Sequence, residues 1–112
     1  MSQTTTLLWI LQGLAALVFL AAGGAKLAGI QQMVDEFAKV GVGQWFRYFT
    51  GLLEVLGAAG LFLPRYSFCS AVLLSVVMIG AVISQLTVVR GSPIAPLVML
   101  LLTAAIAYLR KP

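Results

Sequence analysis

The chain has 112 residues, of which 62% are hydrophobic and only 9% are charged. Soluble domains average about 45–50% apolar and about 25% charged residues, so this composition excludes a water-soluble globule and indicates a membrane protein. The formal net charge of +4 does not indicate nucleic-acid binding, because the Lys and Arg residues stand singly beside apolar runs. They form no basic stripe along which phosphates could bind.

Four apolar runs reach or approach the length of about 20 residues that a helix needs to cross about 30 Å of hydrocarbon. They cover residues 7–29, 45–63, 67–89 and 94–109. The connections between the last three runs are short, and short connections make successive helices antiparallel neighbours. The sequence therefore predicts one all-α domain over residues 1–112, an integral membrane four-helix up-down bundle.

The segment between the first two runs, "IQQMVDEFAKVGVGQ", differs from them in carrying three charges. Its apolar residues recur at intervals of three and four, which is typical of an amphipathic helix. These residues are Ile30, Met33, Val34, Phe37 and Val40. We expect a short amphipathic helix that lies along the membrane interface between spans 1 and 2.

Basic residues flank both sides of the predicted bundle in similar numbers. The side with both termini has Arg65, Arg110 and Lys111, and the opposite side has Lys39, Arg47 and Arg90, with Lys26 as a fourth. The positive-inside rule does not separate such similar counts. The terminal Arg-Lys pair, which no acid accompanies, favours cytoplasmic termini.

The residues of common catalytic and metal sites are missing. The chain has no histidine and one cysteine, Cys69. Ser-His-Asp and Cys-His catalysis and an intramolecular disulfide are therefore excluded, and we predict no catalytic residue and no metal site.

One carboxylate, Glu54, interrupts the apolar stretch "FTGLLEVLGAAGLFLP". A charge inside a membrane is costly and marks a functional site by default. On a helical wheel, small residues gather beside Glu54, whereas large apolar residues lie on the far side, so the carboxylate is predicted to face the bundle interior. The predicted helix-packing residues are Gly23, Gly51, Gly57, Ala58 and Gly80.

Other polar residues are expected at the depth of Glu54. The predicted intramembrane cluster comprises Lys26, Arg47, Glu54, Ser84 and Gln85, and the other half of the bundle is expected to be nearly all hydrocarbon. Three states of Glu54 stay open: paired with Lys26, paired with Arg47, or protonated. The cluster could fix the helix register, or it could form a proton, ion or substrate site.

Four stretches, in this order, resemble the DoxX-like family of small four-helix membrane proteins: "FLAAGGAKLAG", "GLLEVLGAAGLFLP", "MIGAVISQL" and "YLRKP". The resemblance implies a multi-pass protein of the bacterial cytoplasmic (inner) membrane. Some members are similar to the small subunit of a thiosulfate:quinone oxidoreductase. Lys26 and Glu54 match the family's Lys and Glu, but Gln85 stands where the family often has a histidine, and an amide does not titrate or bind a metal as imidazole does.

Three functions are compatible with the sequence. The leading hypothesis is a non-catalytic accessory or scaffold subunit, whose partners would be the lipid bilayer and either a second copy or a larger membrane complex. The alternatives are a quinone- or thiol-linked redox subunit and a proton-coupled small-molecule transporter that uses Glu54. No cofactor is evident from the residues, although a quinone or a lipid would be compatible with the resemblance.

Overall fold

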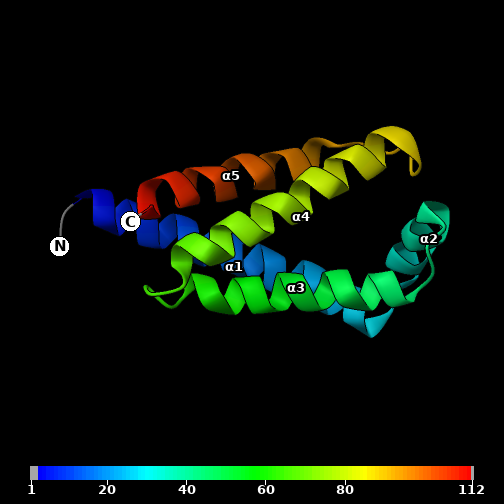
Figure 1. Cartoon of the computed structure of the whole chain (residues 1–112), viewed down its shortest axis with the longest axis horizontal. Helices are drawn as coiled ribbons and strands as arrows, with labels where there is room; N and C mark the ends of the chain where they lie inside the picture. The colour runs from blue at the N-terminus through cyan, green and yellow to red at the C-terminus, as the bar shows by residue number, and fades with distance from the viewer. Residues whose placement is uncertain (1–2, 112) are drawn as a thin grey trace.

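A computed structural model describes residues 3–111 (Figure 1). Within them the fold is all-α, which confirms the predicted class, and it has five helices. The helices are α1 (Gln3–Ala28), α2 (Gln31–Val40), α3 (Trp45–Leu61), α4 (Ser67–Thr87) and α5 (Ile94–Arg110). The amphipathic segment forms α2, and each of the four apolar runs forms one of the longer helices.

The longer helices are arranged as two pairs (Figure 1). Helix α1 packs along α3, and α4 packs along α5, while contacts of α3 with α4 and of α1 with α5 join the pairs. Both chain ends and the 62–66 connection lie at one end of the molecule, which we call the terminal end. Helix α2 and the 88–93 connection lie at the other end, which we call the α2 end.

Local sequence explains where the first two helices stop. Gly29 has φ +73° directly after α1, and Gly41 has φ +80° directly after α2. Only glycine adopts this left-handed conformation without strain, which is why it commonly ends helices. The Gly41 N–H donates to the Phe37 carbonyl, which satisfies one of the acceptors left free at the end of α2.

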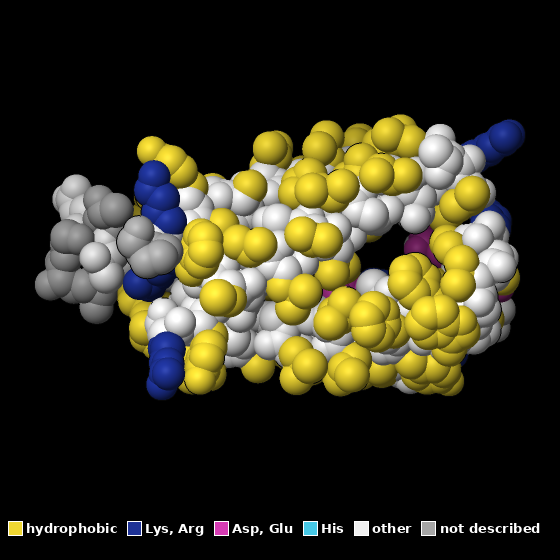
Figure 2. Space-filling view, viewed as in Figure 1, with side chains coloured by type: hydrophobic (Ala, Val, Ile, Leu, Met, Phe, Trp, Pro, Cys, Tyr) yellow, Lys and Arg dark blue, Asp and Glu magenta, His cyan; other side chains and the backbone are white. Residues whose placement is uncertain are grey.

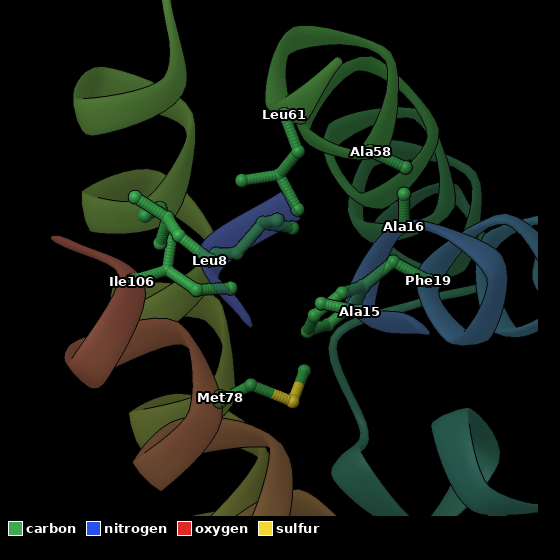
Figure 3. Close-up of a cluster of buried hydrophobic side chains, with 10 residues drawn as sticks. Leu8, Ala15, Ala16, Phe19, Ala58, Leu61, Met78 and Ile106 are labelled. Carbon is green, nitrogen blue, oxygen red and sulfur yellow. The ribbon is translucent and has the colours of Figure 1, made fainter. Parts of the chain in front are cut away.

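The buried core lies between the helix pairs and reaches toward the terminal end (Figure 3). Ala16 of α1 faces Ala58 of α3, and these small side chains let the two helices approach closely. Larger side chains, Leu61 and Ile106 among them, fill the space between the pairs. The outer surface is also covered with apolar side chains (Figure 2).

Three of the predicted packing glycines lie at close helix contacts. A Cβ on Gly23 would lie 2.8 Å from the Gly51 carbonyl oxygen, and one on Gly57 would lie 2.7 Å from the Leu74 side chain. Gly80 is different, since a Cβ there would meet nothing within 4 Å. The expected packing role of Gly80 is therefore wrong, because α4 diverges from α3 at the α2 end (Figure 1).

Within residues 3–111, two helices are long and apolar enough to cross a membrane, over Thr5–Ala28 and Ser67–Thr87. Helix α5 is a shorter apolar helix. Helix α3 has 17 residues, which corresponds to about 26 Å at about 1.5 Å per residue. The longest dimension of the molecule is 46 Å, enough to reach across the hydrocarbon and into both headgroup regions.

Candidate functional site

A buried ion pair joins α1 to α3. Lys26 Nζ lies 2.7 Å from Glu54 Oε1, and the Glu54 side chain is only 1% exposed. The helices come this close because Gly23 and Gly51, about one turn earlier on each helix, meet at the contact. The 2.7 Å separation is that of a charge-assisted hydrogen bond from the ammonium to the carboxylate.

Arg47 does not serve as the partner of Glu54 in this structure. Its Nη1 donates to the Lys26 backbone carbonyl, its Nε donates to Gln44 Oε1 at 2.8 Å, and its guanidinium stacks on Tyr48 at 4.3 Å. The Lys26 carbonyl belongs to the last turn of α1, where helix acceptors lack intrahelical donors. Arg47 therefore caps α1 from the first turn of α3.

A cavity of about 1170 Å³ opens between the helix pairs at the α2 end. In Figure 2 it is visible as an opening between α3 and α4, with acidic side chains at its rim. Lys26 and Glu54 are among its lining residues, and all five helices contribute to its walls. We call it the α2-end cavity.

Ser84 and Gln85 line the same cavity from α4. In the described part of the chain, no hydrogen bond joins either side chain to Lys26 or Glu54. Gln85 Oε1 lies against Gly91 instead, where a Cβ would be only 2.4 Å away. The five predicted site residues thus comprise an ion pair, a capping arginine and two residues of the cavity wall.

The carboxylates of the chain all lie around this cavity. Asp35, Glu36 and Glu54 are the only Asp and Glu residues in the sequence, and each of them lines it. The basic residues of the lining are Lys26, Lys39 and Arg90. The lining therefore has three formal charges of each sign, whereas the whole chain carries +4. In residues 3–111, no three His, Cys, Asp or Glu side chains are grouped closely enough to hold a metal ion.

A second buried polar network lies at the terminal end. Arg110 Nε donates to Gln12 Oε1 at 2.7 Å, and Gln12 Nε2 donates to the Leu61 carbonyl at 2.6 Å and to Ser67 Oγ at 3.2 Å. Arg110 also stacks on Trp9, with Cζ 4.9 Å from the ring centroid. This network ties together α1, α3, α4 and α5.

The expectation that this half of the molecule is nearly all hydrocarbon is therefore wrong. A signal was available, because Gln12 is a lone amide inside the first apolar run. Its partner Arg110 lies 98 residues away along the chain. A pattern of residue spacing identifies neighbours within one helix, and it does not predict a contact between residues so far apart. Gln12 itself is completely buried, so the hydrogen bonds offset the cost of burying its amide.

Apolar helices around buried polar contacts are the organisation of a small helical membrane protein. The profile of the DoxX-like family matches residues 10–108, so the chain belongs to this family. No curated protein and no solved structure matches the chain significantly. The family match confirms the resemblance seen in the sequence, and together with the apolar helices it points to a membrane protein.

Proposed function

We propose that the chain crosses the bacterial inner membrane four times, with α1, α3, α4 and α5 as an up-down bundle and α2 along the interface. The apolar outer surface supports this arrangement (Figure 2). The amphipathic α2 supports its interfacial part, since Phe37 packs inward against Phe46 with ring centroids 5.9 Å apart, while Lys39 is exposed.

The proposed bundle has its termini in the cytoplasm. The terminal end carries Arg65, Arg110 and Lys111, whereas every Asp and Glu lies around the cavity of the other end. The exposed basic residues of the described chain are equal in number at the two ends, Arg65 and Lys111 against Lys39 and Arg90, because Arg47 is buried and Arg110 is half-buried against Gln12. The proposed orientation therefore rests on the terminal Arg-Lys pair, which no acid accompanies, and not on the number of basic residues at each end.

The function that this geometry supports best is that of a non-catalytic accessory or scaffold subunit. The observation that carries it is the use of the buried polar side chains: Lys26 and Glu54 pair with each other, Arg47 caps α1, and Gln12 and Arg110 join helices. These groups stabilise helix contacts, and the surface left for a partner is apolar. Such a surface suits packing against another membrane protein or a second copy.

Affinity purification from native membranes tests this function. We expect the tagged chain, expressed at its natural level and extracted in mild detergent, to retain a membrane protein or a second copy in fixed stoichiometry. A tagged, unrelated four-span protein is the control for non-specific apolar contacts. A chain that elutes as a monomer, with no partner enriched over this control even after crosslinking in the membrane, would contradict an accessory role.

A second candidate is proton-coupled small-molecule transport, because Glu54 borders a cavity large enough for a substrate. The contact with Lys26 disfavours it, since Glu54 already has a counter-ion 2.7 Å from its Oε1 atom. Transport predicts that Glu54→Gln abolishes pH-dependent uptake into proteoliposomes, whereas Glu36→Gln, at another position of the cavity lining, retains it. Uptake that is insensitive to Glu54→Gln would eliminate this candidate.

A further inference from the structure

We propose that the α2-end cavity binds an uncharged amphipathic molecule that carries a hydroxyl group. The hydroxyl is seated on the Lys26–Glu54 pair, and the apolar body of the molecule lies between α3 and α4. This site is independent of the accessory role, because its polar end is the buried Lys26–Glu54 pair and not the apolar outer surface.

The polar end of the ligand follows from the chemistry of the ion pair. Glu54 lines the cavity and is almost completely buried, and its carboxylate has about four acceptor sites, of which the Lys26 ammonium, 2.7 Å from Oε1, occupies one. A hydroxyl group is both a donor and an acceptor. It can donate to the Glu54 carboxylate and accept from the Lys26 ammonium, which lies 2.7 Å from that carboxylate.

The charge of the ligand follows from the equal numbers of acidic and basic side chains that line the cavity. A cation that approached Glu54 would be repelled by Lys26, and an anion that approached Lys26 would be repelled by Glu54. The rest of the lining adds two acids and two bases, namely Asp35 and Glu36 with Lys39 and Arg90. Because neither sign is in excess, the lining favours an uncharged molecule.

The apolar body follows from the size and walls of the cavity. About 1170 Å³ slightly exceeds the range of about 300–1,000 Å³ that is typical of small-molecule sites. The walls beyond the ion pair include Phe46, Phe49 and Leu53 from α3 and Val76 and Met78 from α4. Flat aromatic and adaptable methionine side chains suit a ring or an alkyl chain of variable shape.

The direct test compares two probes, of which only one can donate a hydrogen bond. Calorimetric titration uses the full chain in lipid nanodiscs, with 4-hexylphenol as the hydroxyl probe and 4-hexylanisole, its methyl ether, as the matched probe. The ether keeps the apolar body but cannot donate to Glu54. We expect the phenol to bind about tenfold more tightly or better, as for a hydrogen bond to a charged group. Equal affinities, or tighter binding of dodecylammonium or dodecanoate, would overturn the proposal.

Two glycines supply matched variants for locating the site. Gly80 lines the cavity, whereas Gly24 is exposed outside the lining, and an added Cβ would meet nothing within 4 Å at either position. Gly80→Leu is expected to weaken binding of 4-hexylphenol at least tenfold by occupying the cavity, and Gly24→Leu is expected to leave it unchanged. Equal binding by both variants, with both folded by circular dichroism, would show that the phenol partitions elsewhere.

A double variant separates the hydroxyl contact from the cavity itself. Lys26→Gln combined with Glu54→Gln replaces both charges by neutral amides, of equal length at position 54 and shorter at position 26. We expect it to reduce the preference for 4-hexylphenol over 4-hexylanisole to less than about threefold, because hydrogen bonds to neutral groups are about half as strong. A preference that stays at its original value would place the hydroxyl away from the ion pair.

Discussion

At the level of single residues, the structure explains how an apolar helix accommodates Glu54. An unpaired charge at the centre of a membrane helix costs about 2.5–3.5 kcal/mol on insertion scales. The ammonium of Lys26 lies 2.7 Å from the carboxylate, and this proximity depends on the glycines that bring α1 and α3 together. Glu54 therefore depends on Lys26 as its counter-ion, and this contact depends on Gly23 and Gly51, which allow the two helices to approach closely.

Removal of one member of the ion pair is expected to cost more than removal of both. Lys26→Met leaves a buried carboxylate without its cation and should lower the free energy of unfolding by about 3–5 kcal/mol. Adding Glu54→Leu to this variant should recover most of the loss. Unfolding in mixed micelles, followed by circular dichroism, measures both changes, and a double variant no more stable than the single one would contradict the pairing.

Adjacent glycines of α1 allow a matched test of the close helix approach. Gly23→Ala places a methyl group 2.8 Å from the Gly51 carbonyl oxygen, and we expect a loss of about 1–3 kcal/mol. Gly24→Ala meets no neighbour and should raise stability by up to about 1 kcal/mol through helix propensity. The same unfolding measurement applies, and equal effects of the two substitutions would show that α1 and α3 do not pack through Gly23.

The position of Glu54 could be predicted from the sequence because it depends on one helix. The wheel places Glu54 on the small-residue face, and the helical register brings Lys26 to a similar depth. The role of Arg47 could not be predicted in this way, because its acceptor is a backbone carbonyl exposed only where α1 ends. The partners of Gln12 depend on how all four long helices meet, and no local pattern encodes that.

At the level of elements, α2 is the part with the fewest stabilising contacts. Its main contacts are with α3 and α1, and Phe37 is its one buried residue. Elements with few buried apolar contacts open locally at low free energy. Helix α2 therefore depends on the contact of Phe37 with Phe46.

Phe37→Ala should open α2 without unfolding the rest of the chain. Deletion of a buried aromatic ring costs about 3–5 kcal/mol in a well-packed core, and here most of that loss falls on one peripheral helix. Hydrogen exchange in nanodiscs should become at least tenfold faster for the amides of α2 and stay unchanged in α4 and α5. Exposed Phe62→Ala is the control, and uniform acceleration across all helices would refute a local effect.

The helices themselves could be predicted because hydropathy and helix breakers act locally. Pro64 follows the second apolar run, and Pro93 directly precedes α5, close to the predicted boundaries. The first helix is already formed at Gln3, before its predicted start at residue 7, because polar residues can continue a helix beyond the hydrocarbon. Helix α4 ends at Thr87, two residues before the predicted end of the third apolar run at residue 89. Beyond Thr87 the chain turns toward Arg90, which has a left-handed φ of 56°.

At the level of the whole molecule, the cavity results from the relation between the two helix pairs. The pairs meet through Gly57 and Leu74 but diverge toward the α2 end (Figure 1). Helix crossing angles depend on how individual side chains interlock. The sequence therefore predicts which helices form but not the space between them, and Gly80 was assigned to a contact that the divergence removes.

The proposed orientation predicts opposite labelling of the two ends. In a Cys69→Ser background, Ser92→Cys places a thiol at the α2 end and Lys111→Cys places one at the terminal end. An impermeant maleimide added to intact spheroplasts should label the first at least tenfold more than the second. Permeabilisation should equalise the two signals, and preferential labelling at position 111 would reverse the orientation.

Each end of the molecule also contains one of the two tryptophans. Trp9 stacks against Arg110 at the terminal end, and Trp45 donates its indole N–H to the Val42 carbonyl at the α2 end. Trp45→Phe or Trp9→Phe would leave a single indole fluorophore at a known end of the chain. Indole emission is sensitive to polarity, so this pair of variants would let each membrane surface be observed separately without an attached dye.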